Sequence, residues 1–233
     1  MKSWKTKSGY TIILVLAERS NVFLLTNGQN NILIDTGPKR LWNKLDNRLK
    51  RLKIRHLDYL ILTHSHFDHA GNAKRIKKNY HAKLMVHRIE APFITSGESI
   101  IPDGTNIFTR TLINLFGKSL SSRLRFESCP ADILIDSTFE LREFGFNAYI
   151  WHTPGHTQGS MSIIIDNEIA LVGDTMFGIF RGSVFPPYAD DVPQMLQSWR
   201  KLLETGCSLF IPSHGSANSR ALVERDYYKR INF

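Results

Sequence analysis

The chain has 233 residues, which is enough for one large domain with a sizeable core. Hydrophobic residues make up 42% and charged residues 22%, as in ordinary water-soluble proteins, and no apolar run approaches the roughly 18 residues of a membrane-spanning helix. The two cysteines, Cys129 and Cys207, form no CxxC pair. This excludes a disulfide framework and a thiolate zinc site, and it predicts a reduced, cytoplasmic protein.

The N-terminus resembles a secretory signal peptide only in outline. Three lysines precede an apolar run from Thr11 to Ala17. The run is short, Glu18 and Arg19 follow it, and no small-residue cleavage site is present. We therefore expect a first strand here and no export signal.

The first part of the chain predicts strands followed by a helix. β-Branched and apolar residues, broken by Asn and Gly, fill the segments Thr11–Leu16, Val22–Thr26 and Ile32–Ile34. Leucines at helical spacing predict an amphipathic helix from Pro38 to Leu52, opened by the proline. The next predicted elements are a strand at Leu57–Leu62, a helix over 70–80 and a strand at Leu84–Val86.

The middle of the chain, residues 92–130, predicts a partly helical insertion. Pro, Gly and Ser punctuate it, and apolar residues lie at helical spacing within it: Ile107, Phe108, Leu112, Leu115 and Phe116. Two interpretations stay open, namely simple packing on the core and a lid or wall of a substrate pocket.

The second part repeats the pattern of the first. Predicted strands lie at Ala148–Trp151, Met161–Ile165, Ile169–Val172 and Ser208–Ile211, and a helix is predicted at Val192–Leu203. Strands of one half followed by strands of the other, with helices between, favour an α+β protein in which two packed sheets lie between helix layers. We expect a single domain over residues 1–233.

The net charge of +9 arises largely from two basic segments. They contain Lys39, Arg40, Lys44, Arg48, Lys50, Arg51, Lys53 and Arg55, and then Lys74, Arg75, Lys77, Lys78, Lys83 and Arg88. Such a surface attracts nucleic acid or other anions. No aromatics are interleaved there to stack bases, so we favour two solvated helix faces and expect no nucleic-acid partner.

One short stretch holds four metal-competent side chains. His64, His66, Asp68 and His69 follow an apolar strand directly. In an extended segment His64 and His66 point the same way, because side chains alternate with a period of two. A turn into a helix then brings Asp68 and His69 to a second position nearby. Imidazole and carboxylate ligands without thiolate suit zinc, iron or manganese.

At this point the chain resembles the metallo-β-lactamase superfamily, including its glyoxalase-II-like hydrolases. The resemblance extends from Asp35 to His214 through five ordered motifs, each of which follows a predicted strand. They are Asp35-Thr36-Gly37, the His64–His69 cluster, Thr153-Pro154-Gly155-His156-Thr157, Gly173-Asp174-Thr175 and Pro212-Ser213-His214-Gly215. The resemblance implies a four-layer αββα sandwich.

The resemblance also implies a role for each motif residue. His64, His66 and His156 are expected to bind one metal ion, and Asp68, His69 and His214 a second, with Asp174 bridging both. The expected cofactors are two divalent ions, with zinc preferred over iron or manganese. Asp35 is expected to orient a ligand histidine. His56, His81, His87 and His152 match no motif.

The implied function is a binuclear hydrolase. Coordination lowers the pKa of bound water from 15.7 to about 7, so a metal-bridging hydroxide can attack an ester, thioester, lactone or related bond of a small molecule. Asp68 is expected to act catalytically as well, by steering the hydroxide or passing a proton to the leaving group. The alternatives are a mononuclear iron dioxygenase of the same fold and a phosphodiesterase or nucleic-acid hydrolase.

Several branches of the superfamily fit poorly. Flavodiiron proteins usually carry Glu at the position of His66, and lactone hydrolases of quorum signals place Tyr at the position of Phe177. RNA-processing members need a large inserted domain or a further acidic-histidine motif, and secreted β-lactamases need an export signal. Glyoxalase-II-like thioesterases share three motifs closely but differ after Asp174, and their glutathione-binding tail is not found here.

The segment after Asp174 is expected to line the substrate pocket, because it follows a metal ligand directly. Phe177, Arg181 and Tyr188 are the candidate substrate residues. Arg181 either anchors an anionic group or is a surface arginine beside packed aromatics. The sequence favours a small ester or thioester substrate and leaves a homodimer open.

Overall fold

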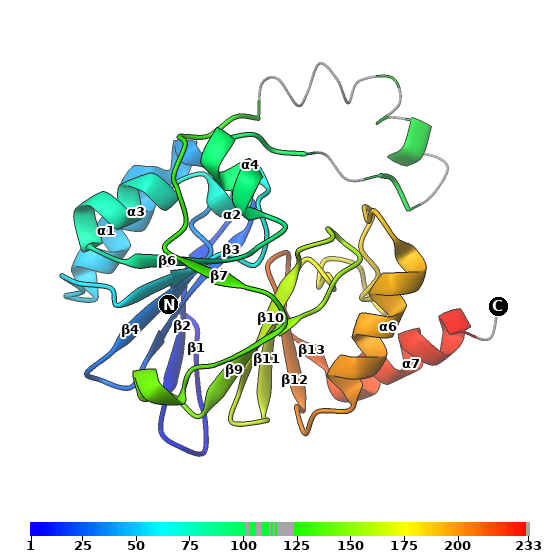
Figure 1. Ribbon diagram of the computed structural model, residues 1–233. Coiled ribbons are helices and arrows are strands. Elements are labelled where there is room, and N and C mark those ends of the chain that lie inside the picture. Colours follow the sequence, from blue (N-terminus) through cyan, green and yellow to red (C-terminus); the bar gives the residue numbers. More distant parts are fainter. Residues whose placement is uncertain (101–102, 106–108, 112, 114, 116–123, 232–233) are drawn as a thin grey trace.

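Two β-sheets pack face to face, and helices cover the outer face of each (Figure 1). The computed structural model describes residues 1–100, 103–105, 109–111, 113, 115 and 124–231. This arrangement of helix, sheet, sheet and helix confirms the α+β, four-layer expectation.

The first sheet takes its strands in chain order. They are β1 (Ser3–Lys5), β2 (Thr11–Ala17), β3 (Asn21–Thr26), β4 (Asn31–Ile34), β5 (Tyr59–Ile61), β6 (Lys83–His87) and β7 (Ile133–Ile135). The pairs from β1 to β4 are antiparallel, and those from β4 to β7 are parallel. The parallel strands end at one edge of the sheet, where the chain turns into the segments that carry most polar motifs.

The second sheet has the order β13-β12-β11-β10-β9-β8. Its strands are β8 (Thr138–Glu140), β9 (Ala148–His152), β10 (Met161–Ile165), β11 (Ile169–Gly173), β12 (Leu209–Pro212) and β13 (Asn218–Ser219). β11 and β12 pair in parallel, with a register shift between Leu171 and Gly173. These two strands therefore deliver the residues that follow them to the same edge.

Helices of the first half cover the first sheet, and those of the second half cover the second (Figure 1). The first set comprises the 3₁₀ turn η1 (Lys39–Leu41), α1 (Trp42–Arg51), α2 (Phe67–Ala70), α3 (Ala73–Tyr80) and α4 (Ala91–Ser96). The second set comprises η2 (Arg142–Phe144), which lies at a sheet end, α6 (Val192–Leu203) and α7 (Arg220–Ile231). None of the helices described is long and apolar enough to cross a membrane.

Three apolar clusters join the four layers. The first cluster packs α1 and α3 on the first sheet, through Leu45, Leu49 and Ile76 among others. The second lies between the two sheets, and the third packs α6 and α7 on the second sheet around the fully buried Trp199. Burial of this kind stabilises the layers by roughly 25 cal/mol per Å².

The predicted helix over 70–80 corresponds to α3, which begins three residues later than predicted and follows a separate short helix, α2. α2 ends at Ala70 and α3 begins at Ala73. A Cβ atom on Gly71 would lie 2.6 Å from the backbone nitrogen of Lys39 and 2.7 Å from the carbonyl oxygen of Gly37. The side-chain amide of Asn72 donates hydrogen bonds to carbonyls of residues 36–38. The break therefore holds the 36–38 segment against the metal-competent stretch.

The described part of the 92–130 insertion makes two kinds of contact. Phe126 and Cys129 are buried in the first apolar cluster. Residues 103–105 lie along residues 186–189, where Thr105 donates its N–H to the Pro187 carbonyl and Gly104 bridges Tyr188. Of the residues that predicted a helix inside the insertion, only Leu115, with 70% exposure, falls within the described residues.

Candidate metal centre

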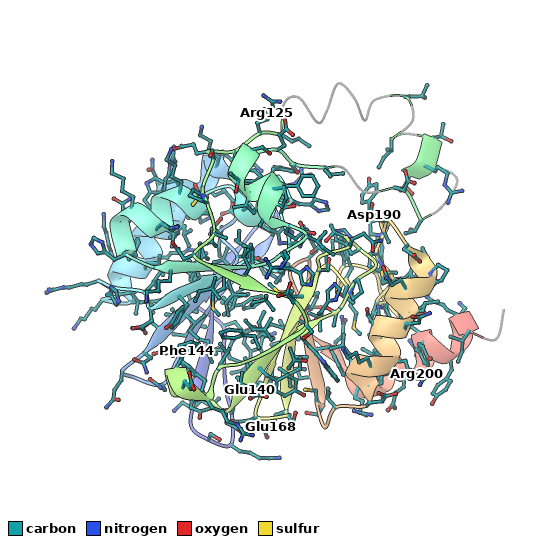
Figure 2. All side chains as sticks on the ribbon, in the orientation of Figure 1. Arg125, Glu140, Phe144, Glu168, Asp190 and Arg200 are labelled. Carbon is teal, nitrogen blue, oxygen red and sulfur yellow. The ribbon has the colours of Figure 1, made fainter. Side chains whose placement is uncertain are left out.

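The motif residues gather where strands of both sheets end. Asp35 follows β4, the His64–His69 stretch follows β5, His156 follows β9, Asp174 follows β11 and His214 follows β12. In Figure 2 the site lies toward the end marked by Asp190, whose N–H donates to the His156 carbonyl, and away from Glu140 and Glu168. The structure thus brings all eight predicted motif residues together.

The first ligand group consists of His64, His66, His156 and Asp174. All four are buried, and one ligand atom from each lies within 4.8 Å of the others. His66 Nδ1 is 2.8 Å from His64 Nε2 and 3.2 Å from His156 Nε2. His156 donates from its other nitrogen, Nδ1, to the Tyr188 carbonyl at 2.9 Å, which leaves Nε2 with a lone pair facing the group.

The second ligand group consists of Asp68, His69 and His214, with the same 4.8 Å limit. Asp174 contacts histidines of both groups. Its Oδ1 is 3.5 Å from His69 Nε2, and its Oδ2 is 3.2 Å from His214 Nε2 and 3.5 Å from His156 Nε2. The two groups therefore share one carboxylate.

Asp35 supports the second group from outside. It is fully buried, and its Oδ2 accepts a hydrogen bond from His69 Nδ1 at 2.8 Å and one from the Ser213 hydroxyl at 3.0 Å. Its Oδ1 accepts the N–H of Thr63 at 2.9 Å. The backbone of Asp35 has a φ of 59°, which an aspartate tolerates better than most residues. The carboxylate fixes the tautomer of His69 so that Nε2 faces the site.

The donor set fits a divalent metal ion. His69 Nε2 and Asp174 Oδ1 are buried atoms that lack a hydrogen-bond partner within the described part of the chain. Buried polar atoms are rarely left without a partner. A cation shared by an imidazole nitrogen and a carboxylate oxygen satisfies both atoms, and this nitrogen–oxygen set without thiolate suits zinc, iron and manganese.

The electrostatics differ between the two groups. Burial lowers the pKa of His64 and His66 well below the usual value, with neighbouring histidines adding to the effect, and burial also lowers the pKa of His156. These imidazoles are therefore neutral near pH 7, which is the form that binds a metal ion.

Carboxylates dominate in the second group. Burial opposes charge on His69 and His214, but Asp174 outweighs it and raises the pKa of both, with Asp35 adding to the effect at His69. Burial likewise opposes charge on Asp174, yet His214 and His69 hold the pKa of its carboxyl well below its usual range. The pocket thus favours positive charge beside Asp174.

The three candidate substrate residues lie in different surroundings. The Phe177 ring stacks on His214 with centroids 4.7 Å apart, and Tyr188 holds His156 through its backbone carbonyl. Arg181 has an exposed side chain, next to the exposed Ile179 and Phe180. Only Phe177 contacts a candidate ligand with its side chain among the contacts described.

Two histidines without a motif role form a pair of their own. His87 and His152 stack with ring centroids 4.0 Å apart, where the end of β6 meets the end of β9. His152 donates to the Gln158 carbonyl and His87 to that of Asp136. They pack between the two halves and do not belong to either ligand group.

Sequence reasoning missed two residues near the centre. The Arg19 Nε lies 3.5 Å from Asp68 Oδ2, and its guanidinium covers the Phe67 ring at 5.1 Å. Glu90 reaches the ligand segments from the start of α4 and is buried. Both lie outside the motifs, and a single sequence carries no signal that joins a hairpin arginine or a distant glutamate to the cluster.

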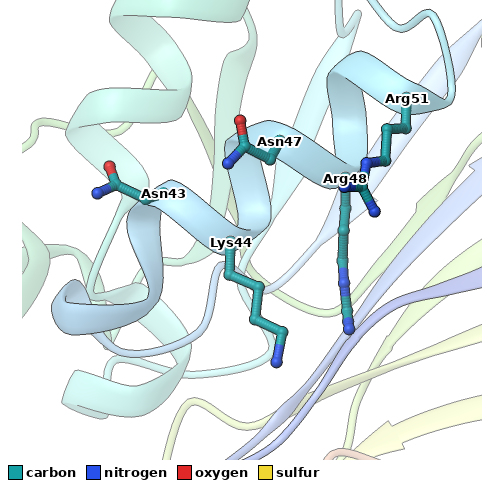
Figure 3. A pocket seen from close by; sticks show the side chains of 5 residues that line it. All are labelled: Asn43, Lys44, Asn47, Arg48 and Arg51. Atoms are coloured by element: carbon teal, nitrogen blue, oxygen red, sulfur yellow. The ribbon is translucent and has the colours of Figure 1, made fainter.

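The basic segments lie outside this centre and only partly on helices. Most of their residues lie on η1, α1 and α3, but Lys53 and Arg55 follow α1, Lys83 lies in β6 and Arg88 follows it. Part of their charge is paired, as in Lys50 with Asp46 at 2.6 Å and Lys77 with Asp132 at 2.7 Å. Figure 3 shows a surface pocket on α1 lined by Asn43, Lys44, Asn47, Arg48 and Arg51. None of its lining residues is a candidate ligand.

Comparison with known sequences places the motifs in one family. A family model described as the metallo-beta-lactamase superfamily matches residues 16–214. A probable metallo-hydrolase of Methanocaldococcus jannaschii is 31% identical over 205 residues, which cover 86% of this chain and 90% of that protein. A hydroxyacylglutathione hydrolase of Haemophilus influenzae is 29% identical over 211 residues, or 88% of this chain and 90% of that protein.

Solved structures share the fold. An archaeal metallo-beta-lactamase superfamily protein from Sulfolobus tokodaii aligns with a TM-score of 0.68 at 22% identity, covering 96% of this chain and 86% of that one. A structure of another protein, TTHA1623, described in a di-iron-bound form, aligns with a TM-score of 0.65 at 22% identity, covering 92% of this chain and 97% of that one.

Proposed function

The chain belongs to the metallo-beta-lactamase superfamily, and from this premise we propose that it is a binuclear metal-dependent hydrolase of small-molecule esters, thioesters or lactones. One observation carries the proposal. The Asp174 carboxylate contacts His156 in the first ligand group and both His69 and His214 in the second. A carboxylate shared in this way suits two ions held side by side.

Each group supplies ligands for one ion. We assign His64, His66 and His156 to the first ion, Asp68, His69 and His214 to the second, and Asp174 to both. When bound, such a pair acts as a Lewis acid on the scissile bond and makes hydroxide available near neutral pH. Zinc is our first expectation, and the di-iron-bound relative supports iron as the second.

The protein's own residues position the reaction. Asp35 keeps the Nδ1–H of His69 in a hydrogen bond, so that Nε2 is presented to the site. Asp68 Oδ2 lies 3.7 Å from His214 Nε2 and its side chain is 9% exposed, so it can take a proton from water and give it to the leaving group. Hydrolysis then consumes one water and yields a carboxylic acid with an alcohol or thiol.

The substrate class that we favour is a thioester. A hydroxyacylglutathione hydrolase matches most of this chain and shares its length closely. Phe177 offers an apolar ring beside His214, and Arg19 places a half-exposed guanidinium next to Asp68. An arginine at this position suits a substrate with a carboxylate. We assign Arg181 and Tyr188 to the outer part of the substrate pocket.

The compartment that we propose is the cytoplasm. Both cysteines are free and buried, and burial raises the pKa of each thiol. Such thiols persist in a reducing environment and need no oxidising one.

The test combines metal content with hydrolysis. Protein purified without chelators should contain about two divalent ions per chain, and it should cleave a hydroxyacyl thioester of glutathione faster than a phosphodiester. Replacing Asp174 by Ala should reduce both metal content and rate. Asp226→Asn is the matched control, because Asp226 is a buried carboxylate outside both ligand groups.

Other outcomes would redirect the assignment. About one iron per chain, together with oxygen uptake on a sulfur substrate, would replace the hydrolase by a mononuclear dioxygenase. Cleavage of phosphodiesters alone would select the nucleic-acid alternative. A chain that binds no divalent ion and leaves every ester, thioester and lactone intact would reject the proposal.

A further inference from the structure

Glu90 is a buried carboxylate that belongs to neither ligand group. It is 3% exposed and lies at the N-terminal boundary of α4, where its backbone carbonyl accepts the N–H groups of Phe93 and Ile94. Its side chain points away from the helix into the ligand segments. Burying a carboxylate costs free energy unless hydrogen bonds compensate, so its partners indicate its purpose.

The two oxygens of Glu90 divide their partners between two segments. Oε2 accepts the N–H of Ser65 at 2.9 Å and also the Ser65 hydroxyl. Oε1 accepts the Thr157 hydroxyl at 2.8 Å and the N–H of Gly159 at 3.1 Å. Two backbone and two hydroxyl donors thus converge on one side chain, and a carboxylate with about four lone-pair positions accepts them all.

Two of the three partner residues of Glu90 are immediate neighbours of candidate metal ligands. Ser65 stands between His64 and His66, and Thr157 follows His156. These three histidines are the imidazoles of the first ligand group. The segments come from different sheets, since one follows β5 and the other follows β9. Glu90 therefore links the two halves of the protein through hydrogen bonds to the segments that carry the histidines of the first group.

Local packing keeps the side chain of Glu90 close to these donors. A Cβ atom on Gly159 would lie 2.5 Å from Glu90 Cγ and 2.7 Å from Oε1, so the absence of a side chain there allows the close approach. The Ser160 hydroxyl accepts the N–H of Thr157 and contacts the Thr157 hydroxyl at 2.9 Å. This orders the donation from Thr157 to Glu90.

Asp35 plays the corresponding part in the second group. It accepts from His69 directly and from the hydroxyl of Ser213, the residue before His214. Glu90 makes no described contact with Asp68, His69 or His214 among the hydrogen bonds and ion pairs of the structure. Asp35 also accepts the N–H and the hydroxyl of Thr63, the residue before His64, so it contacts both groups. The described partners of Glu90 lie beside ligands of the first group alone.

We propose that Glu90 is the positioning residue of the first metal site, where it fixes the spacing between the His64–His66 segment and His156 without binding metal. The inference rests on the proposed metal centre. It predicts that loss of the carboxylate weakens one metal site and spares the other.

The substitution that tests this is Glu90→Gln. Glutamine has nearly the same shape but offers one acceptor oxygen and one N–H₂ group. Whichever way the amide turns, its N–H₂ faces two donors, so the bonds to one ligand segment are lost. The effect on each site is measured separately, with His214→Ala isolating the first group and His156→Ala isolating the second.

The readout is Co²⁺ binding, followed by visible absorption and by competition with a chelator. In the His214→Ala chain, Glu90→Gln should weaken Co²⁺ binding by about 10- to 100-fold, the usual effect of losing a residue that orients ligands. In the His156→Ala chain, the affinity should change by less than about threefold. In the otherwise unchanged protein, Glu90→Gln should leave one of two Co²⁺ equivalents tightly bound.

Asp226→Asn is the control for a general loss of stability. Asp226 is also 3% exposed and its Oδ2 accepts the Ser183 hydroxyl and the Val184 N–H, both at 2.8 Å. Its substitution should lower the unfolding temperature and leave both Co²⁺ affinities unchanged.

Three results would overturn the inference. Unchanged Co²⁺ affinity in the His214→Ala chain removes the positioning role. If Glu90→Gln weakens Co²⁺ binding equally in both single-site chains, and Asp226→Asn weakens it to the same extent, Glu90 has only a general structural role. If the unsubstituted protein binds neither Co²⁺ nor zinc, the proposed function is wrong, and the role proposed for Glu90 is wrong as well.

Discussion

Asp68 contacts both the second ligand group and the turn between β2 and β3. Its carboxylate lies between His214 and Arg19, and its backbone carbonyl accepts the Ser20 hydroxyl. The side chain of Asp68 is 9% exposed, against 4% for Asp174, the other carboxylate of the two ligand groups. Asp68 is therefore the carboxylate best placed to exchange a proton with substrate.

A substitution at Asp68 separates the two roles that we assign to it. Asp68→Ala should lower kcat by about 10²- to 10⁴-fold, which is the range for loss of a general acid or base. The first ligand group should keep its ion, because Asp68 is not part of it. Metal analysis and steady-state kinetics on one preparation measure both. An enzyme that retains full metal and full activity would remove Asp68 from the mechanism.

The residues of the site could be predicted from sequence because the motifs are local. Four of the seven candidate ligands fall within residues 64–69, and the others follow strands that apolar runs mark clearly. Glu90 and Arg19 could not be predicted, since their partners are distant in sequence. The spacing from Glu90 to Thr157 is set only by how the two sheets pack.

At the scale of elements, α6 and the His156 loop depend on each other. Asp191 caps α6 by accepting the N–H of Gln194 at 2.9 Å, and its own N–H donates to the Gly155 carbonyl. Gly155 has a φ of 130°, and a Cβ atom there would lie 2.3 Å from the backbone nitrogen of Met195. The first turn of α6 thus packs directly against Gly155, the residue before the candidate ligand His156.

Gly155→Ala should disrupt the first ligand group through this contact. The added methyl meets helix backbone in a conformation that L residues rarely adopt, so the loop that carries His156 must move. We expect loss of about one metal equivalent, read by elemental analysis. Asp191→Ala is the matched control on the same helix. It should cost about 1 kcal/mol of unfolding free energy and leave metal content unchanged.

An alanine variant at Gly155 that bound metal like the unsubstituted protein would show that the helix and loop adjust freely. A loss of metal in Asp191→Ala equal to that in Gly155→Ala would mean that helix stability, and not loop position, controls the site.

Elements with a clear apolar pattern were predicted well, and weakly patterned ones were not. The helix Val192–Leu203 and the strand Met161–Ile165 have the predicted bounds, because the helix buries one face and the strand is a mostly apolar run that is buried along its whole length. α7 was missed, since only Val223 and Asp226 of it are buried. β1, β7, β8 and β13 have two or three residues each, too few for an alternating pattern.

At the scale of the molecule, the metal centre joins the two halves. The first half contributes His64, His66, Asp68 and His69, and the second contributes His156, Asp174 and His214. Each ligand group contains residues from both halves. Ions that bind the folded protein but not the separated halves therefore stabilise the packing of one sheet on the other.

Removal of metal should lower the stability of the whole protein. Ligands that bind only the folded state add about 2.7 kcal/mol per site when their free concentration is 100 times Kd. Unfolding by urea, with chelator or with zinc, measures the difference. The double variant His64→Ala with His214→Ala should show no response to zinc. Equal stability of the unsubstituted protein in both conditions would contradict a metal centre that spans the halves.

The division of ligands between the halves also sets an order of events during synthesis. His214 lies 150 residues after His64. At 5–20 residues per second, translation of that interval takes roughly 8 to 30 s. The first group is complete only when Asp174 has been made, and the second only when His214 has been made. Until then the nascent chain displays His64, His66, Asp68 and His69 as incomplete ligand sets. Such an incomplete set follows the general affinity order of divalent metals, in which copper binds more tightly than zinc or iron. Selection of the working metal therefore falls to the finished fold and to the ions that the cell keeps available once translation has ended.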